Sequence, residues 1–230
     1  MEKQENYSEL ASFTGKLFRD NFGKGPTSIY VSIEHPFITI YMRDFLAPME
    51  KVLIKQKKNL KIEETRDLLM KDMMPELKAQ IRVNLGVDVE NIYYDWSLKN
   101  RSGLLLAVIK EDTEEKEVLD YTDYDNKNLI HEQIIKMSEL AEKAPEQVDS
   151  QYLNDRTLVI ERRGILVEIE SELIRSGFSE QLRLSKRQLE KRLLDAAVFG
   201  TILGVKIIDI FVDWDFDLDK SHITFILKPN

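Results

Sequence analysis

The chain contains a long internal repeat. The segment LGVDVENIYYDWSLKNRSGLLLAVIK at residues 85–110 aligns without a gap with LGVKIIDIFVDWDFDLDKSHITFILK at residues 203–228. The alignment pairs Trp96 with Trp214, which are the only two tryptophans of the chain. A repeat of this length predicts two copies of one structural unit rather than a single irregular domain.

A second match lies upstream of the first. YVSIEHPFITIYM at residues 30–42 pairs with TLVIERRGILVEI at residues 157–169, with Glu34 against Glu161 and a tight turn following in each. Apolar and polar residues alternate along the first of these segments, as is typical of a half-buried strand. Each copy is therefore expected to contain one hairpin here and another within the long repeat.

Apolar residues at helical spacing open each copy. They are Tyr7, Leu10, Ala11, Leu17 and Phe18 in the first copy, and Ile130, Ile134, Met137 and Ala141 in the second. A further helical region is expected at residues 65–84 and at residues 185–202, where Ser185 would be an N-cap and Gly86 and Gly204 would end the helices. Pro75 predicts a kink or a new helix after Met74.

This order of elements predicts an α+β fold with two tandem repeats of a helix-hairpin-helix-hairpin unit, antiparallel sheets and helices on one face of each sheet. The expected domains are a first repeat at residues 1–112 and a second, divergent repeat at residues 127–230. An acidic linker would join them at residues 113–126, where carboxylates greatly outnumber lysines. An approximate two-fold relation between the repeats is also expected.

The two tryptophans are expected to be core residues, because each lies on the apolar face of an alternating strand. Around Trp214 the opposite face of the strand would carry five aspartates in solvent, namely Asp209, Asp213, Asp215, Asp217 and Asp219. The Asp-x-Asp-x-Asp pattern also resembles the start of a calcium-binding loop. Leu218 or Lys220 occupies the position where such a loop needs a glycine, so we expect no metal site.

Composition narrows the function classes. The net charge of −8 argues against nucleic-acid binding, the chain has no cysteine, and no apolar stretch has the length of a transmembrane segment. The histidines His35, His131 and His222 lack metal-ligand spacing, and no nucleophile or phosphate-binding motif is present. We therefore expect a cytoplasmic protein with no catalytic residue, cofactor or metal, and hence no enzyme.

Two stretches concentrate positive charge in this acidic chain. Solvated helix faces explain both, but either could also contact an anionic partner or a membrane surface. The first contains Lys51, Lys55, Lys57, Lys58 and Lys61, which form the candidate docking surface. The second contains Arg183, Lys186, Arg187, Lys191 and Arg192.

The first copy is similar to a known family. The motifs GKGP at residues 23–26, FLAPMEKVL at 45–53, MMPELKAQI at 73–81 and LGVDVENIYYD at 85–95 occur in the order found in the MpsC family, named for a sodium-translocating, membrane-potential-generating system. The resemblance covers about residues 7–112. The second copy departs from it, with AEKAPEQVDSQYLNDR in place of the GKGP entry and nine residues missing before Gly204.

The resemblance implies a soluble bacterial accessory component that is cytoplasmic or peripheral at the membrane. Its implied partners are membrane-embedded subunits linked to sodium translocation, membrane potential and bicarbonate supply, and a second copy of the chain is a further candidate partner. The resemblance brings no catalytic residues. The alternative is a stand-alone protein that binds or converts a small ligand in a cleft between the repeats.

Overall fold

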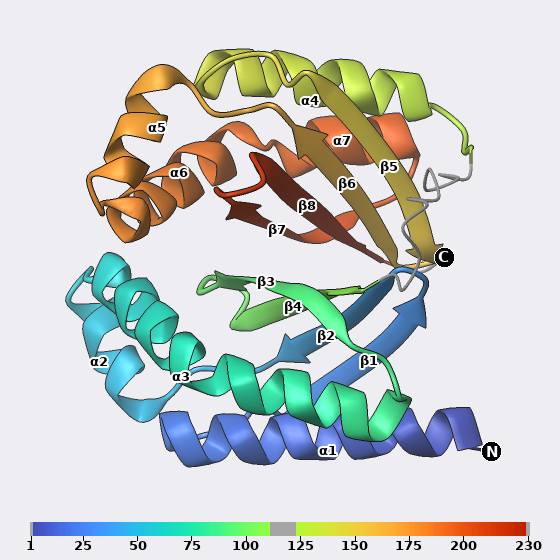
Figure 1. Cartoon of the computed structure of the whole chain (residues 1–230), viewed down its shortest axis with the longest axis vertical. Helices are drawn as coiled ribbons and strands as arrows, with labels where there is room; N and C mark the ends of the chain where they lie inside the picture. The colour runs from blue at the N-terminus through green and yellow to red at the C-terminus, as the bar shows by residue number, and fades with distance from the viewer. Residues whose placement is uncertain (1, 111–122, 229–230) are drawn as a thin grey trace. The chain divides into compact units, whose positions relative to one another are not determined.

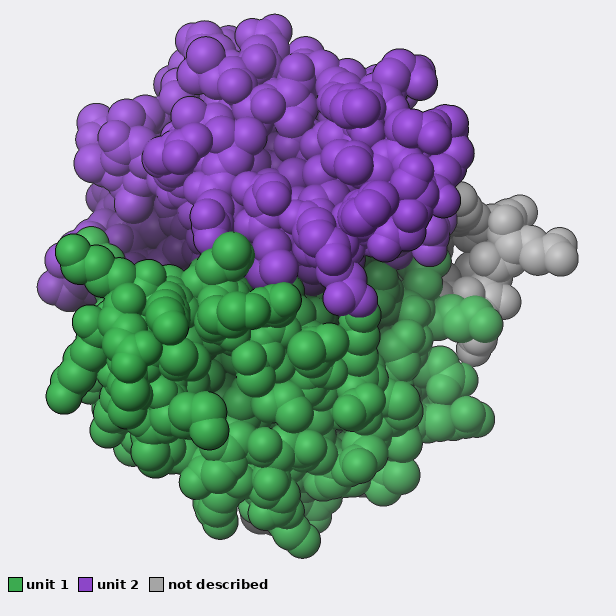
Figure 2. Space-filling model, turned by 90° about the vertical axis from the view of Figure 1, so that its left-hand side faces the viewer, with its two compact units in different colours: residues 1–114 green, residues 115–230 purple. Residues whose placement is uncertain are grey.

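The computed structural model describes residues 2–110 and 123–228. The chain divides into two compact units, residues 1–114 and 115–230 (Figure 2). Within each unit, helices cover one face of a four-stranded antiparallel sheet (Figure 1). The predicted α+β fold with two similar halves is therefore confirmed. The acidic linker expected at residues 113–126 lies largely outside the described residues.

Unit 1 follows the predicted order of elements with one additional short helix. Its elements are α1 (Glu2–Phe22), β1 (Ser28–Glu34), β2 (Phe37–Arg43), α2 (Pro48–Lys55), α3 (Asn59–Leu85), β3 (Val89–Ser97) and β4 (Ser102–Ile109). The strand order is β1-β2-β4-β3, so the two hairpins join through β2 and β4.

Unit 2 repeats this arrangement. Its elements are α4 (Lys127–Ala141), β5 (Gln147–Asn154), β6 (Thr157–Arg163), α5 (Glu168–Arg175), α6 (Ser179–Leu193), α7 (Ala196–Leu203), β7 (Ile207–Asp215) and β8 (Lys220–Leu227). The strand order is β5-β6-β8-β7, which is the order of unit 1 with each strand replaced by its counterpart.

The ungapped register of the long repeat is confirmed in the strands. Trp96 pairs with Gly103 across the first hairpin, and Trp214 pairs with Ser221 across the second. Both hairpins also carry a register shift near the start of their first strand. Gly86 and Gly204 end the preceding helices in the left-handed conformation, with φ of 69° and 66°. Glycine adopts this conformation without the steric cost that other residues incur.

The predicted upstream hairpin of the second copy is wrong in register. The strands are β5 and β6, at residues 147–163, and not residues 157–169. The polar sequence of β5 conceals its inward alternation of Val148, Ser150 and Tyr152. The apolar run after β6 instead places Ile165 in the core and then begins α5. With this register, residues of β6 are numbered 120 higher than their counterparts in β2, and residues of β8 are numbered 118 higher than those in β4. Between the second strand and the fourth strand, unit 2 is therefore two residues shorter than unit 1, and not nine.

The second helical region also differs from its prediction. In unit 1 it is one helix, α3, which passes through Pro75. In unit 2 it divides into α6 and α7, and Asp195 caps α7 by accepting a hydrogen bond from the backbone amide of Ala197 at 2.8 Å. Ser185 lies inside α6 and is not an N-cap. The two helices α2 and α5 were not predicted, because eight residues are too few for a clear periodic pattern.

The core of each unit lies between the helices and the inner face of the sheet. Trp96 and Trp214 are each 1% exposed and occupy equivalent places in the two cores. In unit 1, Trp96 belongs to an apolar cluster with residues of α1 and α3 such as Leu10, Phe18 and Met70. In unit 2 the apolar cluster draws on α4 and α7, including Ile130 and Phe199.

Candidate functional site

The candidate docking lysines all lie on one part of unit 1. Lys51 and Lys55 are on α2, Lys57 and Lys58 are in the turn that follows, and Lys61 is in the first turn of α3. All five are exposed. We call residues 48–61 the α2–α3 tip. It lies at the end of unit 1 opposite to the N-terminal end of α1 (Figure 1).

A buried ion pair holds the inner side of this tip. The guanidinium of Arg66 on α3 donates from Nε and Nη2 to the two carboxylate oxygens of Glu50, at 2.7 and 2.8 Å. Glu50 also accepts a hydrogen bond from the backbone amide of Ala47, which caps the start of α2. Arg66 lies over the rings of Phe45 and Trp96, 4.4 and 4.8 Å from their centroids. The inner face of α2 is thus fixed to the core, which leaves its outer face for contact with a partner.

The outer face of the tip is both apolar and basic. Met49 and Val52, one turn apart on α2, are 75% and 53% exposed, and Leu60 at the start of α3 is 47% exposed. Lys51 and Lys55 form a neighbouring row on the same helix. Apolar and cationic side chains therefore share one surface.

The corresponding tip of unit 2 has different chemistry. Where unit 1 exposes Val52 and Leu60, unit 2 has Glu172 and Glu180. The positions of the five lysines are occupied by Ser171, Arg175, Gly177, Phe178 and Gln181. The basic surface is therefore a property of unit 1 and not of the shared fold.

The second basic stretch does not form a solvated face. Lys186 and Arg187 on α6 are 3% and 0% exposed. Arg183 donates to the carboxylate of Asp213 and to the backbone carbonyl of Trp214. Asp209 and Asp213 are each 4% exposed, so the prediction that all five aspartates around Trp214 are solvated is also wrong. The reason for the first difference is that α6 turns part of its charged face inward, where Arg183 pairs with Asp213 and Lys186 pairs with Glu142 and Glu170.

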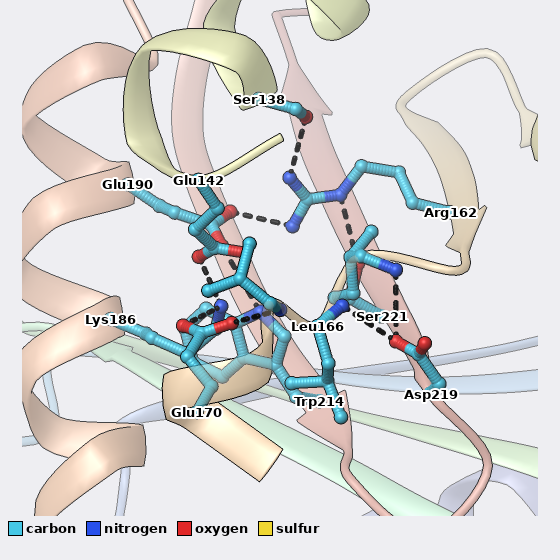
Figure 3. Close-up of polar contacts among 12 residues, drawn as sticks. Ser138, Glu142, Arg162, Leu166, Glu170, Lys186, Glu190, Trp214, Asp219 and Ser221 are labelled. Atoms are coloured by element: carbon cyan, nitrogen blue, oxygen red, sulfur yellow. Dashed lines mark hydrogen bonds and ion pairs between the residues drawn. The ribbon is translucent and has the colours of Figure 1, made fainter. Parts of the chain in front are cut away.

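The buried charges of unit 2 form a network beside Trp214 (Figure 3). Arg162 on β6 donates to Glu190 of α6 at 2.6 Å, to Ser138 of α4 at 2.9 Å and to Ser221 of β8 at 2.9 Å. The other carboxylate oxygen of Glu190 accepts a hydrogen bond from Nε1 of Trp214 at 3.1 Å. The guanidinium of Arg162 therefore links β6 to the strand β8 and to the helices α4 and α6.

Lys186 is the second centre of this network. Its ammonium group donates to Glu170 of α5 at 2.8 Å and forms an ion pair with Glu142, which follows α4 (Figure 3). It also lies 5.8 Å from the centroid of the Trp214 ring. Glu170 and Lys186 correspond to Glu50 and Arg66 of unit 1, so this pair belongs to the shared framework, whereas Arg162 and Glu190 have no charged counterpart there.

Burial and neighbouring charge shift the protonation of Glu142. Burial raises the pKa of its carboxyl group to about 7, and repulsion from Glu190 adds to the effect, while Lys186 opposes it. Glu142 therefore exchanges a proton near neutral pH, unlike an ordinary glutamate.

None of the three histidines belongs to the α2–α3 tip: His35 is in the turn between β1 and β2, and His131 and His222 are in unit 2. His131 of α4 lies 2.7 Å from Ser150 of β5, whose hydroxyl also contacts the hydroxyl of Tyr124 at 2.7 Å. Burial lowers the pKa of His131, as does the charge of Lys127, and burial raises that of Tyr124 to about 12. Ser150 is fully buried, so this chain of hydrogen bonds joins α4 to β5 within the fold.

His222 of β8 contacts Glu161 of β6 at 3.1 Å. Burial opposes ionisation of Glu161, but its hydrogen bond with His222 and the charges of His222 and Lys220 lower its pKa to about 2. Sequence reasoning missed both histidine contacts, because each joins segments separated by many residues. Charged residues at inward-facing positions of α6, such as Glu190, could have indicated the network. The wrong register of the β5–β6 hairpin hid the fact that Arg162 takes the place of Met42.

Comparison with known proteins identifies the family. The family model described as "Na+-translocating membrane potential-generating system (MpsC)" matches residues 2–111 and again residues 127–229. The chain belongs to the MpsC family. Both units match, so the second is an MpsC unit in its own right. No curated protein and no solved structure matches the chain.

The family name connects MpsC proteins with a sodium-translocating system that generates a membrane potential. Within the ranges that the structure describes, this MpsC chain has no helix that is long and apolar enough to cross a membrane.

Proposed function

We propose that the chain is a cytoplasmic accessory component, peripheral at the membrane, of a bacterial system linked to sodium translocation, membrane potential and inorganic-carbon supply. It acts through contacts and not through catalysis. The α2–α3 tip of unit 1 is its docking surface. The observation that carries this proposal is the exposure of Lys51, Lys55, Lys57, Lys58 and Lys61 together on that tip.

Electrostatics supports this assignment. The chain as a whole carries a net charge of −8, so an anionic membrane repels it except where positive charge is concentrated. The ion pair of Arg66 with Glu50 fixes α2 from within, so the lysines extend from a rigid base. Clustered charge of this kind accelerates encounter with an oppositely charged surface and orients the bound protein.

The test is recovery of the full chain with membranes from its own host. We compare the wild type with a variant that combines Lys55→Glu, Lys57→Glu and Lys58→Glu. The variant should lose most of its membrane recovery, and wild-type recovery should fall as salt is raised, because ions screen exposed charges over about 8 Å at physiological ionic strength.

A matched control changes the same charge elsewhere in unit 1. Lys16, Lys99 and Lys110 are also exposed, and they lie outside the tip. Their combined replacement by glutamate should leave recovery close to wild type. Equal recovery of the wild type and the tip variant at every salt concentration would refute the docking surface.

Detergent extraction distinguishes this function from a stand-alone ligand-binding protein. Stable recovery of membrane-embedded subunits with the wild-type chain supports the accessory role. Stabilisation of the isolated chain by a small molecule, without any membrane recovery, would instead favour ligand binding.

A further inference from the structure

The outer face of α2 has two adjacent rows of side chains. Met49 and Val52 form the apolar row, and Lys51 and Lys55 form the basic row. Leu60 at the start of α3 is a further exposed apolar residue of the tip, and Lys57 and Lys58 are further exposed lysines in the turn between the two helices. The inner residue Glu50 is buried in its pair with Arg66, so the helix cannot rotate its apolar row inward.

This combination matches the interface of a lipid bilayer. At that interface, apolar side chains enter the region between headgroups and acyl chains, and lysines contact anionic headgroups. The negative potential of a cytoplasmic leaflet attracts basic segments that lie close to it. An acidic patch on a soluble protein complements the lysines but not the protruding Met49 and Val52.

We propose that the α2–α3 tip binds the anionic lipid surface itself, with Met49, Val52 and Leu60 inserted at the headgroup level and the lysines on phosphate groups. This inference rests on the proposed function and names the partner of its docking surface. The tip of unit 2 is not a lipid site, because Glu172 and Glu180 replace two of the apolar residues there.

The test uses co-sedimentation of the full chain with vesicles. One set contains phosphatidylcholine with phosphatidylglycerol, and the other contains phosphatidylcholine alone. The wild type should bind the anionic vesicles and release them as salt is raised. The variant with Lys55→Glu, Lys57→Glu and Lys58→Glu should bind the anionic vesicles at least about tenfold more weakly, because each lysine near the surface contributes to binding.

A second variant isolates the apolar contribution. Replacing Met49 and Val52 together by serine keeps every lysine, and it should weaken binding to anionic vesicles several-fold by removing the inserted side chains. Its control replaces Ile169 and Phe178 of unit 2 by serine. These residues are 66% and 49% exposed on the matching tip, and their loss should leave vesicle binding unchanged.

Three results would overturn the lipid assignment. They are absence of wild-type binding to anionic vesicles, equal binding to both vesicle types, and equal losses in the unit 1 and unit 2 serine variants. If the wild type ignores vesicles but still requires the tip lysines for recovery with native membranes, the lipid inference fails and the proposed function stands. If the tip lysines affect neither assay, both fail.

Discussion

In unit 1 the buried tryptophan packs among aromatic rings and methionines beside a single cation, Arg66, whereas in unit 2 its counterpart also lies against buried carboxylate and hydroxyl side chains. Trp96 contacts Phe18 and Phe45, with ring centroids 6.1 and 5.9 Å away. Trp214 lies near Lys186, the counterpart of Arg66, and in addition donates to Glu190, which takes the place of Met70. The same backbone framework therefore accommodates two kinds of core chemistry.

Aligning the two units shows how this difference arises. The substitutions from unit 1 to unit 2 are Phe18 to Ser138, Phe22 to Glu142, Met42 to Arg162, Met70 to Glu190 and Gly103 to Ser221. Each introduces a polar group, and most of these groups bond to one another. A buried polar group is tolerated only when it has partners, so these positions must change together.

The glycine at position 103 illustrates the constraint. A Cβ atom on Gly103 would lie 2.5 Å from the ring of Trp96, so only glycine fits beneath that ring. In unit 2 the hydroxyl of Ser221 occupies the equivalent strand position and accepts a hydrogen bond from Arg162. The packing of the tryptophan and the presence of the charge network are thus linked.

The largest expected effect is loss of either tryptophan. Trp96→Ala and Trp214→Ala should each lower the free energy of unfolding by about 3–5 kcal/mol, because each leaves a large cavity in its unit. Urea unfolding followed by circular dichroism measures both. Tryptophan emission of the wild type should be typical of buried indole, and emission typical of solvated indole from both residues would contradict the account of the two cores.

Removing one partner of the Arg162–Glu190 ion pair should lower the free energy of unfolding nearly as much as the loss of a tryptophan. Arg162→Met gives unit 2 the residue found in unit 1 and leaves Glu190 buried without its cation, which should cost about 3–5 kcal/mol of unfolding free energy. The double variant with Glu190→Met should be more stable than either single variant, because no uncompensated charge remains.

A double-mutant cycle measures this coupling. Because the double variant should be more stable than either single variant, the coupling between Arg162 and Glu190 should exceed about 3 kcal/mol, the smallest loss expected for Arg162→Met. If the two single losses simply add in the double variant, the network is not the unit that replaces the aromatic packing of unit 1.

A smaller effect should appear in the pH dependence of stability. The pKa of Glu142 is about 7 in the folded chain against an ordinary value of 4.5, so the folded state holds a proton that the unfolded state has released. The contribution of this group is fully present below about pH 4.5 and is lost as the pH rises through about 7. Glu142→Gln removes this dependence.

The measurement is the difference in unfolding free energy between wild type and Glu142→Gln from pH 4 to pH 8. Wild-type stability should fall relative to the variant as the pH rises across that range. The pKa of Glu161 is lowered to about 2 and that of His131 is also lowered, so both contributions weaken on acidification, but they cancel in this difference because both chains retain these residues. A constant difference across the range would rule out the proton on Glu142.

The smallest expected effect concerns the docking surface. The combined Lys55→Glu, Lys57→Glu and Lys58→Glu variant should unfold within about 0.5 kcal/mol of the wild type, because exposed charges contribute little to stability. Thermal and urea unfolding check this. A loss comparable to that of Arg162→Met would mean that the lysines support the fold, and their effects on membrane recovery would then have another explanation.

The sequence predicted the parts of the fold that periodicity and the repeat specify. The strand pairs carrying Trp96 and Trp214 followed from their ungapped match, and the ends of α3 and α7 followed from Gly86 and Gly204. The β5–β6 hairpin of unit 2 was not predicted correctly, because β5 has Ser150 and Gln151 at positions where a strand usually has branched apolar residues.

The candidate site was predictable only in part. The lysines of the α2–α3 tip were visible as a run of like charge, but the exposed Met49 and Val52 became apparent only once Glu50 was seen to face Arg66. The basic run of α6 has a similar composition, yet its Lys186 and Arg187 are buried. Composition does not show which way a helix turns, since that depends on contacts between distant segments.

The most direct test of the docking account compares the two tips in one assay. Membrane recovery of the full chain is measured for the triple glutamate variant of unit 1 and for a variant of the unit 2 tip, Arg175→Glu with Phe178→Glu and Gln181→Glu. These three residues occupy the positions of Lys55, Lys58 and Lys61. The account predicts that the unit 1 variant is lost from membranes as salt approaches physiological strength, while the unit 2 variant is recovered as fully as the wild type. Equal recovery of both variants, or equal loss of both, would contradict it.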